Sequence, residues 1–201
     1  LVHMIHVNQD EIEMLAETGT NVLHCPSTAM KISYGLSAFG KFPEMMAQGV
    51  NVAIGTDASD CSNFNDMVRL MYLAATTPKD YRYDPSAGSA EKAIEMATIN
   101  AARAMNLEKE IGSLEAGKKA DIAIFDMRRP DWVPLYNELQ NLVYSAQGSS
   151  CESVIIDGKF AMENREVKTV DEMEIVDRIQ QLAKGVLKRT KLPVYSKWKF
   201  V

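Results

Sequence analysis

A nearly unbroken apolar run at Val50–Ile54 constrains the fold of this 201-residue chain more than any other feature. Such runs are typical of parallel strands that are covered on both faces. Two further apolar segments lie at residues 1–7 and 20–23, and segments with helical patterning separate the three. Strands separated by about 10–15 helical residues are typical of βαβ units. We therefore predict an α/β fold for residues 1–57.

The helices of this part carry start and stop signals. Asn8 and Glu11 have the spacing of a capping box, and Gly19 is a natural end for the helix that they begin. Farther along, an apolar stripe predicts a helix over 66–75, and an alanine-rich pattern predicts one long helix over 89–105.

The sequence changes character near residue 111, which divides it into two predicted units, 1–110 and 111–201. In the second unit, Asp157-Gly158 between two short strands is typical of a hairpin with a type I′ turn. Thr169 and Glu172 form a capping-box candidate for a last helix. We expect this unit to be mostly antiparallel β, with a C-terminal helix and tail.

Composition narrows the range of partners and compartments. A net charge of -5 argues against nucleic acid or an anionic membrane as partner, because both attract basic surfaces. The three cysteines form no CxxC pair, which favours reduced thiols and a cytoplasmic location. The chain lacks an initial Met and begins inside an apolar run, so we expect that its N-terminus is a cut and that functional residues precede it.

The candidate site residues lie where predicted strands end. Ligands of α/β folds bind at the carboxyl ends of strands, so Asp57 is a candidate metal ligand or general base. A helix N-cap is the alternative for Asp57, and a core position is the alternative for His3 and His24. Cys25 and Cys61 are soft-ligand candidates without a partner at the usual zinc spacing, and we interpret them as buried thiols. Phosphate-binding-loop, GxSxG, HExxH and cytidine-deaminase motifs are absent.

Taken together, several segments resemble the amidohydrolase superfamily, and within it the branch of methylthioadenosine/S-adenosylhomocysteine deaminases and triazine chlorohydrolases. The segments that carry this resemblance are Val2-His3, His24-Cys25-Pro26-Ser27 with Lys31, Gly55-Thr56-Asp57 with Ser62-Asn63, and residues 95–100, 111–121, 141–145 and 154–159. They keep the family's order along the chain.

The resemblance implies the C-terminal part of a metal-dependent (β/α)8 TIM barrel and part of a small β-sandwich. Residues 1–110 would supply barrel strands six to eight with their helices, and residues 111–201 the sandwich portion. A complete barrel needs about 250 residues. The part outside this chain would carry the HxH pair of strand one and the His and Glu of strand five.

The resemblance also implies a role for each candidate. Asp57 matches the strand-eight aspartate, a metal ligand that accepts a proton from the attacking water. His3 matches the strand-six histidine, which contacts the developing oxyanion or ligates a metal. His24 matches a strand-seven position that lines the substrate pocket. Ala29 departs from the family, because many relatives carry Asn there.

The expected reaction is hydrolytic deamination of an N-heterocycle, a purine or an adenosine thioether, with zinc or iron as the divalent metal. Loss of another leaving group is one alternative, such as chloride or an alkylamine from a triazine, or opening of a cyclic amide. A non-catalytic remnant of the fold is the second alternative. A soluble domain that binds a partner through its exposed barrel edge is the third. Family habit implies a homo-oligomer.

Overall fold

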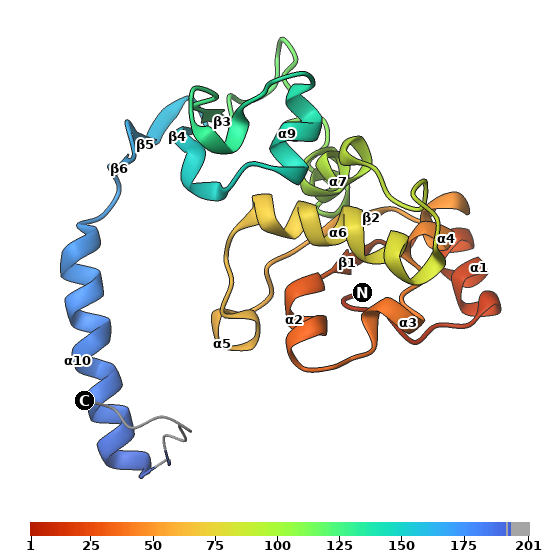
Figure 1. The fold of residues 1–201 in the computed structure, drawn as a ribbon, viewed down its shortest axis with the longest axis horizontal. Coiled ribbons are helices and arrows are strands. Elements are labelled where there is room, and N and C mark those ends of the chain that lie inside the picture. The colour runs from red at the N-terminus through yellow and green to blue at the C-terminus, as the bar shows by residue number, and fades with distance from the viewer. Residues whose placement is uncertain (192, 194–201) are drawn as a thin grey trace.

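The computed structural model describes residues 1–191 and 193. Its first part holds short parallel strands and the helices that connect them (Figure 1). These elements are α1 (Gln9–Glu17), β1 (Val22–His24), α2 (Pro26–Lys31), α3 (Leu36–Phe39), α4 (Phe42–Ala47), β2 (Val52–Ile54), α5 (Ser59–Ser62), α6 (Met67–Arg82), α7 (Ala90–Ala97) and α8 (Ile99–Ala104).

Three segments run side by side in parallel, as the βαβ pattern predicts. β1 pairs with β2 in a register that sets His24 opposite Ile54. On the other edge of β1, Val2 forms a parallel bridge to Leu23, and the Leu23 N–H donates to the Leu1 carbonyl at 2.8 Å. The first segment is therefore much shorter than the predicted strand over residues 1–7.

Paired positions of a parallel sheet share a face, so the register divides these strands into two sets. Val22 and Val52 are fully buried in the hydrophobic core, and Ile54 joins them there. Leu23 lies on the opposite face and is only partly buried, and Val2, its partner, is 50% exposed. The helices thus cover one face of the strands in the described part of the chain.

The helix ends follow from local chemistry. Asn8 caps α1, and both hydrogen bonds of the predicted capping box are present. α6 extends seven residues beyond the predicted 75, through Pro78, to Arg82. There the Arg82 guanidinium binds the Glu44 carboxylate at 2.8 Å and the Gly40 carbonyl at 2.9 Å, which holds α6 against α4.

The predicted single helix over 89–105 is instead two helices, α7 and α8. The chain breaks at Thr98, where φ is -126° and ψ is -96°. Beyond the break, the Asn100 side chain donates to the Val52 carbonyl, and the Asn51 side chain donates to the Asn100 carbonyl. These bonds hold α8 against β2, a long-range contact that a local helical pattern does not reveal.

The second part is an antiparallel sheet with order β3-β4-β5-β6, together with two α-helices. Its elements are β3 (Ile122–Phe125), η1 (Pro130–Trp132), α9 (Glu138–Tyr144), η2 (Gly148–Ser150), β4 (Cys151–Ile156), β5 (Lys159–Glu163), β6 (Glu166–Val167) and α10 (Glu172–Thr190). The predicted hairpin is confirmed, because Asp157 and Gly158 both have positive φ, as a type I′ turn requires. α9, which the sequence pattern did not predict, packs against α6 and α7.

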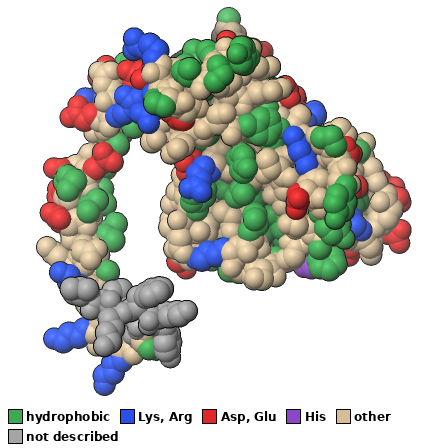
Figure 2. Space-filling view, viewed as in Figure 1, with side chains coloured by type: hydrophobic (Ala, Val, Ile, Leu, Met, Phe, Trp, Pro, Cys, Tyr) green, Lys and Arg blue, Asp and Glu red, His purple; other side chains and the backbone are tan. Residues whose placement is uncertain are grey.

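α10 stands away from the rest of the molecule (Figure 1). Its N-cap is Asp171, whose side chain accepts from the Glu174 N–H, so the predicted capping pair of Thr169 and Glu172 is wrong. Its apolar side chains are exposed, and Figure 2 shows open space between the helix and the body. Most of the predicted tail lies outside the described residues. No helix of the described part is long and apolar enough to cross a membrane.

His24 lies on the helix-covered face of β1. Its ring packs on Phe42 of α4 at a centroid distance of 3.8 Å, and the residue is 3% exposed. Burial, with a smaller contribution from His3, lowers the pKa of His24 from 6.5 to about 3.

This burial predicts acid-sensitive stability. The unfolded chain binds a proton on His24 below pH 6.5, but the folded chain does so only near pH 3. Stability is therefore full above that window and falls as pH drops through it, by at most about 1.4 kcal/mol per pH unit. Urea unfolding between about pH 7.5 and about pH 4.5 should show wild type losing stability relative to His24→Phe. A His6→Phe variant, which changes an exposed ring, is the matched control; parallel curves for wild type and His24→Phe would contradict the prediction.

Candidate active site

Asp57 occupies a strained turn directly after β2. Its φ is 62°, a left-handed conformation that non-glycine residues seldom adopt. Gly55 precedes it because a Cβ there would lie 3.1 Å from the Leu23 side chain. Strained residues cluster at functional sites, where surrounding contacts hold them. The turn therefore fixes a carboxylate at the carboxyl end of β2.

The electrostatic surroundings keep this carboxylate ionised. The Ala58 N–H donates to Asp57 Oδ1 at 2.7 Å and lowers the pKa of Asp57, and the nearby His3 acts in the same direction. An ionised carboxylate is the form that binds a metal and accepts a proton.

His3 also lies in a left-handed turn, with φ of 70°, and Met4 after it has φ of 47°. This double turn ends the first parallel segment and brings His3 Nε2 to 3.7 Å from Asp57 Oδ2. The Tyr34 ring meets the imidazole edge-to-face at 5.7 Å. His3 Nδ1 is buried and has no hydrogen-bond partner within the described residues. The structure thus brings the predicted His3 and Asp57 together.

Cys25 is the third residue of this cluster. The ligand atoms of His3, Cys25 and Asp57 all lie within 4.8 Å of one another. Burial raises the pKa of the Cys25 thiol to about 11, and the Asp57 charge adds to the effect. Sequence spacing gave Cys25 no ligand partner, because its neighbours come from other strands. The parallel pairing of β1 with β2 brings the ends of the two strands side by side, and Cys25 and Asp57 meet there.

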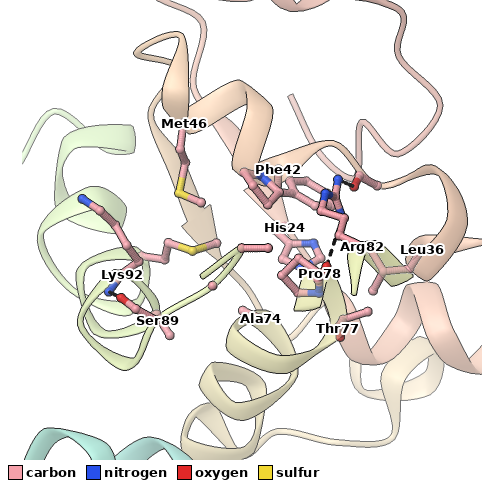
Figure 3. Close-up of a pocket in the computed structure, with 16 residues that line it drawn as sticks. His24, Leu36, Phe42, Met46, Ala74, Thr77, Pro78, Arg82, Ser89 and Lys92 are labelled. Carbon is pink, nitrogen blue, oxygen red and sulfur yellow. Dashed lines mark hydrogen bonds between the residues drawn. The ribbon is translucent and has the colours of Figure 1, made fainter. Parts of the chain in front are cut away.

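His24 lies on the other side of β1 from Cys25, and its predicted role in lining the substrate pocket stays a prediction. Successive residues of a strand point to opposite faces, so His24 and Cys25 diverge. Figure 3 shows His24 near Phe42, Pro78 and Arg82, in a pocket between α4, α6 and α7. His24 is therefore buried on the helix side of β1, where it lines this pocket.

The structure also shows the surroundings of two further residues that the family resemblance singled out, Ala29 and Lys31. Ala29 is 1% exposed within the hydrophobic core, so the missing amide at this position is a change in packing. Lys31 donates to the Asp60 carbonyl and to the Asn63 side chain, which joins the loop after β1 to the loop that follows Asp57.

The cluster fits a divalent metal by its donor chemistry. Imidazole nitrogen, carboxylate oxygen and thiolate sulfur are the ligands that zinc takes in proteins. Among the residues described, the buried Nδ1 of His3 has no hydrogen-bond partner, as expected where a ligand or a further hydrogen-bonding group completes a site.

Comparison with known proteins also supports the predicted family. The profile of the amidohydrolase family matches residues 1–161. A 5-methylthioadenosine/S-adenosylhomocysteine deaminase of Moorella thermoacetica is 45% identical over 184 residues, which are 91% of this chain and 42% of that protein. The chain thus spans less than half the length of the curated relatives that it matches.

Solved structures share the fold. A zinc-bound adenosine deaminase from Xanthomonas campestris superposes with a TM-score of 0.86 at 32% identity, over 93% of this chain and 42% of that one. The atrazine chlorohydrolase TrzN of Arthrobacter aurescens, with zinc, has a TM-score of 0.84 over 90% of this chain and 40% of its own. At 23% identity that second likeness shows the fold alone.

These findings confirm the predicted resemblance to the deaminase and triazine hydrolase branch. They also confirm the predicted architecture, the C-terminal part of a TIM barrel with part of a β-sandwich. Since the family profile covers the parallel strands, their helices and β3 and β4, the chain belongs to the amidohydrolase family.

Proposed function

We propose that this chain supplies the C-terminal part of a metal-dependent hydrolase that deaminates an N-heterocycle of the adenosine type. The observation that carries the proposal is the approach of His3 to Asp57, 3.7 Å, at the carboxyl ends of parallel strands. The 45% identity to a methylthioadenosine/S-adenosylhomocysteine deaminase supports the substrate class, a purine or adenosine thioether.

In this proposal Asp57 would hold the metal and moves the proton, and His3 would ligate only a second metal, as the resemblance implies for relatives with two metals. A zinc ion held there, with iron as the alternative, would lower the pKa of a bound water to about 7. Asp57 accepts the proton of the attacking water, since its lowered pKa leaves the carboxylate ionised at neutral pH. The same carboxyl then returns the proton to the departing amino group, so that water and the amine become a carbonyl and ammonia.

His3 is the group that faces the oxygen of the attacked ring carbon. Its imidazole lies beside the carboxylate, and the Tyr34 ring fixes its orientation from the edge. A preorganised donor of this kind stabilises negative charge that develops in the transition state. Protonation of the ring nitrogen falls to the strand-five Glu that the resemblance places outside this chain.

The proposal also covers the domain organisation, the partners, the cellular location and the oligomeric state. Residues 1–110 form the barrel portion and residues 111–201 the sandwich portion with α10 and the tail. The partner is a small N-heterocycle, without nucleic acid or membrane. Three free cysteines, Cys25, Cys61 and Cys151, support a reducing cytoplasm. We propose a homo-oligomer, and the exposed apolar side chains of α10 offer a surface for it.

Replacement of Asp57 tests the central role. In the complete gene product, Asp57→Asn should reduce ammonia release from methylthioadenosine at least about 10²-fold and should lower bound metal, because it removes ligand and base together. Ammonia assays and metal analysis of protein purified without added metal measure both. Asp60→Asn, which changes an exposed acid on the same loop, is the matched control. Wild-type turnover by Asp57→Asn would exclude this role.

Replacement of His3 tests the oxyanion role. His3→Gln should lower kcat about 10²–10³-fold with little change in KM, since the lost interaction forms mainly in the transition state. Steady-state kinetics on the same substrate provide the measurement. The control is His6→Gln, which alters an exposed ring that contacts the Tyr34 carbonyl at 2.8 Å. A rise in KM with unchanged kcat would instead assign His3 to ground-state binding.

A further inference from the structure

We propose that Lys31 is a positioning residue for Asp57, because its ammonium group joins α2 to the loop that carries this carboxylate. The inference rests on the proposed proton-transfer role of Asp57. Lys31 and Asn63 both belong to segments that carry the family resemblance, and the roles that the resemblance implies include neither of them. A bond between the two side chains gives them one shared role.

This bridge spans the ends of two neighbouring strands. Lys31 is the last residue of α2, which follows β1, and Asn63 directly follows α5, which comes after β2. Because β1 and β2 are parallel, both segments start at the same edge of the sheet. There Lys31 Nζ donates to Asn63 Oδ1, 32 residues away in the sequence, and to the Asp60 carbonyl at 3.3 Å.

The helix that carries Lys31 is firmly anchored. α2 begins at Pro26, and three of its residues, Pro26, Thr28 and Ala29, are buried. The Ala29 N–H donates to the Cys25 carbonyl at 3.1 Å, which ties the helix to the residue that follows β1. Lys31 itself is exposed, so its side chain reaches the neighbouring loop from a fixed base.

Asn63 belongs to a loop that is closed by its own hydrogen bonds. Asn63 has φ of 53° and ends α5, and its Nδ2 donates to the Ser59 carbonyl at 2.9 Å. The Ser62 N–H donates to the Ala58 carbonyl at 3.0 Å. These bonds make one unit of the loop that begins at Asp57, and Lys31 joins that unit to α2.

The geometry of Asp57 depends on this loop. Its φ of 62° is a strained conformation, which persists only where surrounding contacts hold it. Asp57 Oδ1 also accepts from the Ala58 N–H, so a shift of the loop moves the carboxylate. A displacement of about 1 Å near the reacting groups costs about 10²-fold in rate. Hydrogen bonds of an exposed lysine add little to stability, so loss of the Lys31 ammonium should affect the rate more than the fold.

Kinetics of the complete gene product test the bridge from both ends. Lys31→Met keeps the aliphatic stem and removes the ammonium group, and Asn63→Gly keeps the positive φ and removes the amide. Each should lower kcat on methylthioadenosine about tenfold with KM within about twofold, and Lys31→Met should keep the wild-type melting temperature. Lys31→Arg should restore most of kcat, because the guanidinium keeps the donors. Lys92→Met, which removes an exposed ion pair with Glu95 on α7, is the matched control.

The double variant Lys31→Met/Asn63→Gly separates one shared role from two independent roles. If both side chains act through one bridge, the double variant loses no more kcat than either single variant. Losses that multiply would overturn the bridge, and so would wild-type kcat in Lys31→Met. A rise in KM at unchanged kcat would also overturn it, because that result assigns Lys31 to substrate binding.

Hydrogen exchange provides a readout that needs neither substrate nor metal. In metal-free complete gene product, the amides of residues 58–63 should exchange faster in Lys31→Met than in wild type, while those of β1 and β2 keep their rates. Faster exchange throughout would indicate a general loss of stability and would overturn a positioning role. Unchanged exchange at 58–63 with unchanged kcat would overturn the role of Lys31 and leave the proposed deaminase intact. Wild-type protein that releases no ammonia would overturn both.

Discussion

The parallel pairing of β1 with β2 is the constraint on which the candidate site depends. Its register sets Leu23 opposite Ala53 and His24 opposite Ile54. Because side chains alternate across a strand, His24 shares the helix face with Ile54, while Cys25 and Asp57 meet beyond the two strand ends. A slip of one residue would exchange the two sets. The buried Val22 and Val52 resist such a slip, since it would expose both side chains.

The two faces of these strands carry different kinds of side chain. On the helix face, the strand side chains pack in a continuous core with α4, α6 and α7, and His24 is neutral there beside Phe42. The opposite face keeps a half-exposed Val2 and the polar cluster at the strand ends. The hydrophobic core and the polar cluster thus lie on opposite sides of the same strands. The strained turns at His3 and Asp57 are held by the well-packed helix layer.

Local signals in the sequence predicted the features that depend on near neighbours. The Asn8 capping box, the Asp157-Gly158 turn and the apolar run before Asp57 all needed only residues close in the chain. The break at Thr98 could not be predicted in this way, because Asn100 bonds to β2, and the segments lie 48 residues apart. The pairing of Cys25 with Asp57 also depends on strand register, which spacing along the chain does not encode.

The exposure of apolar side chains on Val2 and α10 also has a physical explanation. The chain covers 42% of a curated relative, and barrel strands are covered on both faces in a complete TIM barrel. Val2 at 50% exposure and the bare apolar stripe of α10 are surfaces of the kind that further barrel and sandwich strands or another subunit would cover. The cluster of His3, Cys25 and Asp57 borders this open face rather than the helix layer. Groups that would complete the proposed metal centre would therefore approach from the side opposite to His24, where the barrel axis would lie.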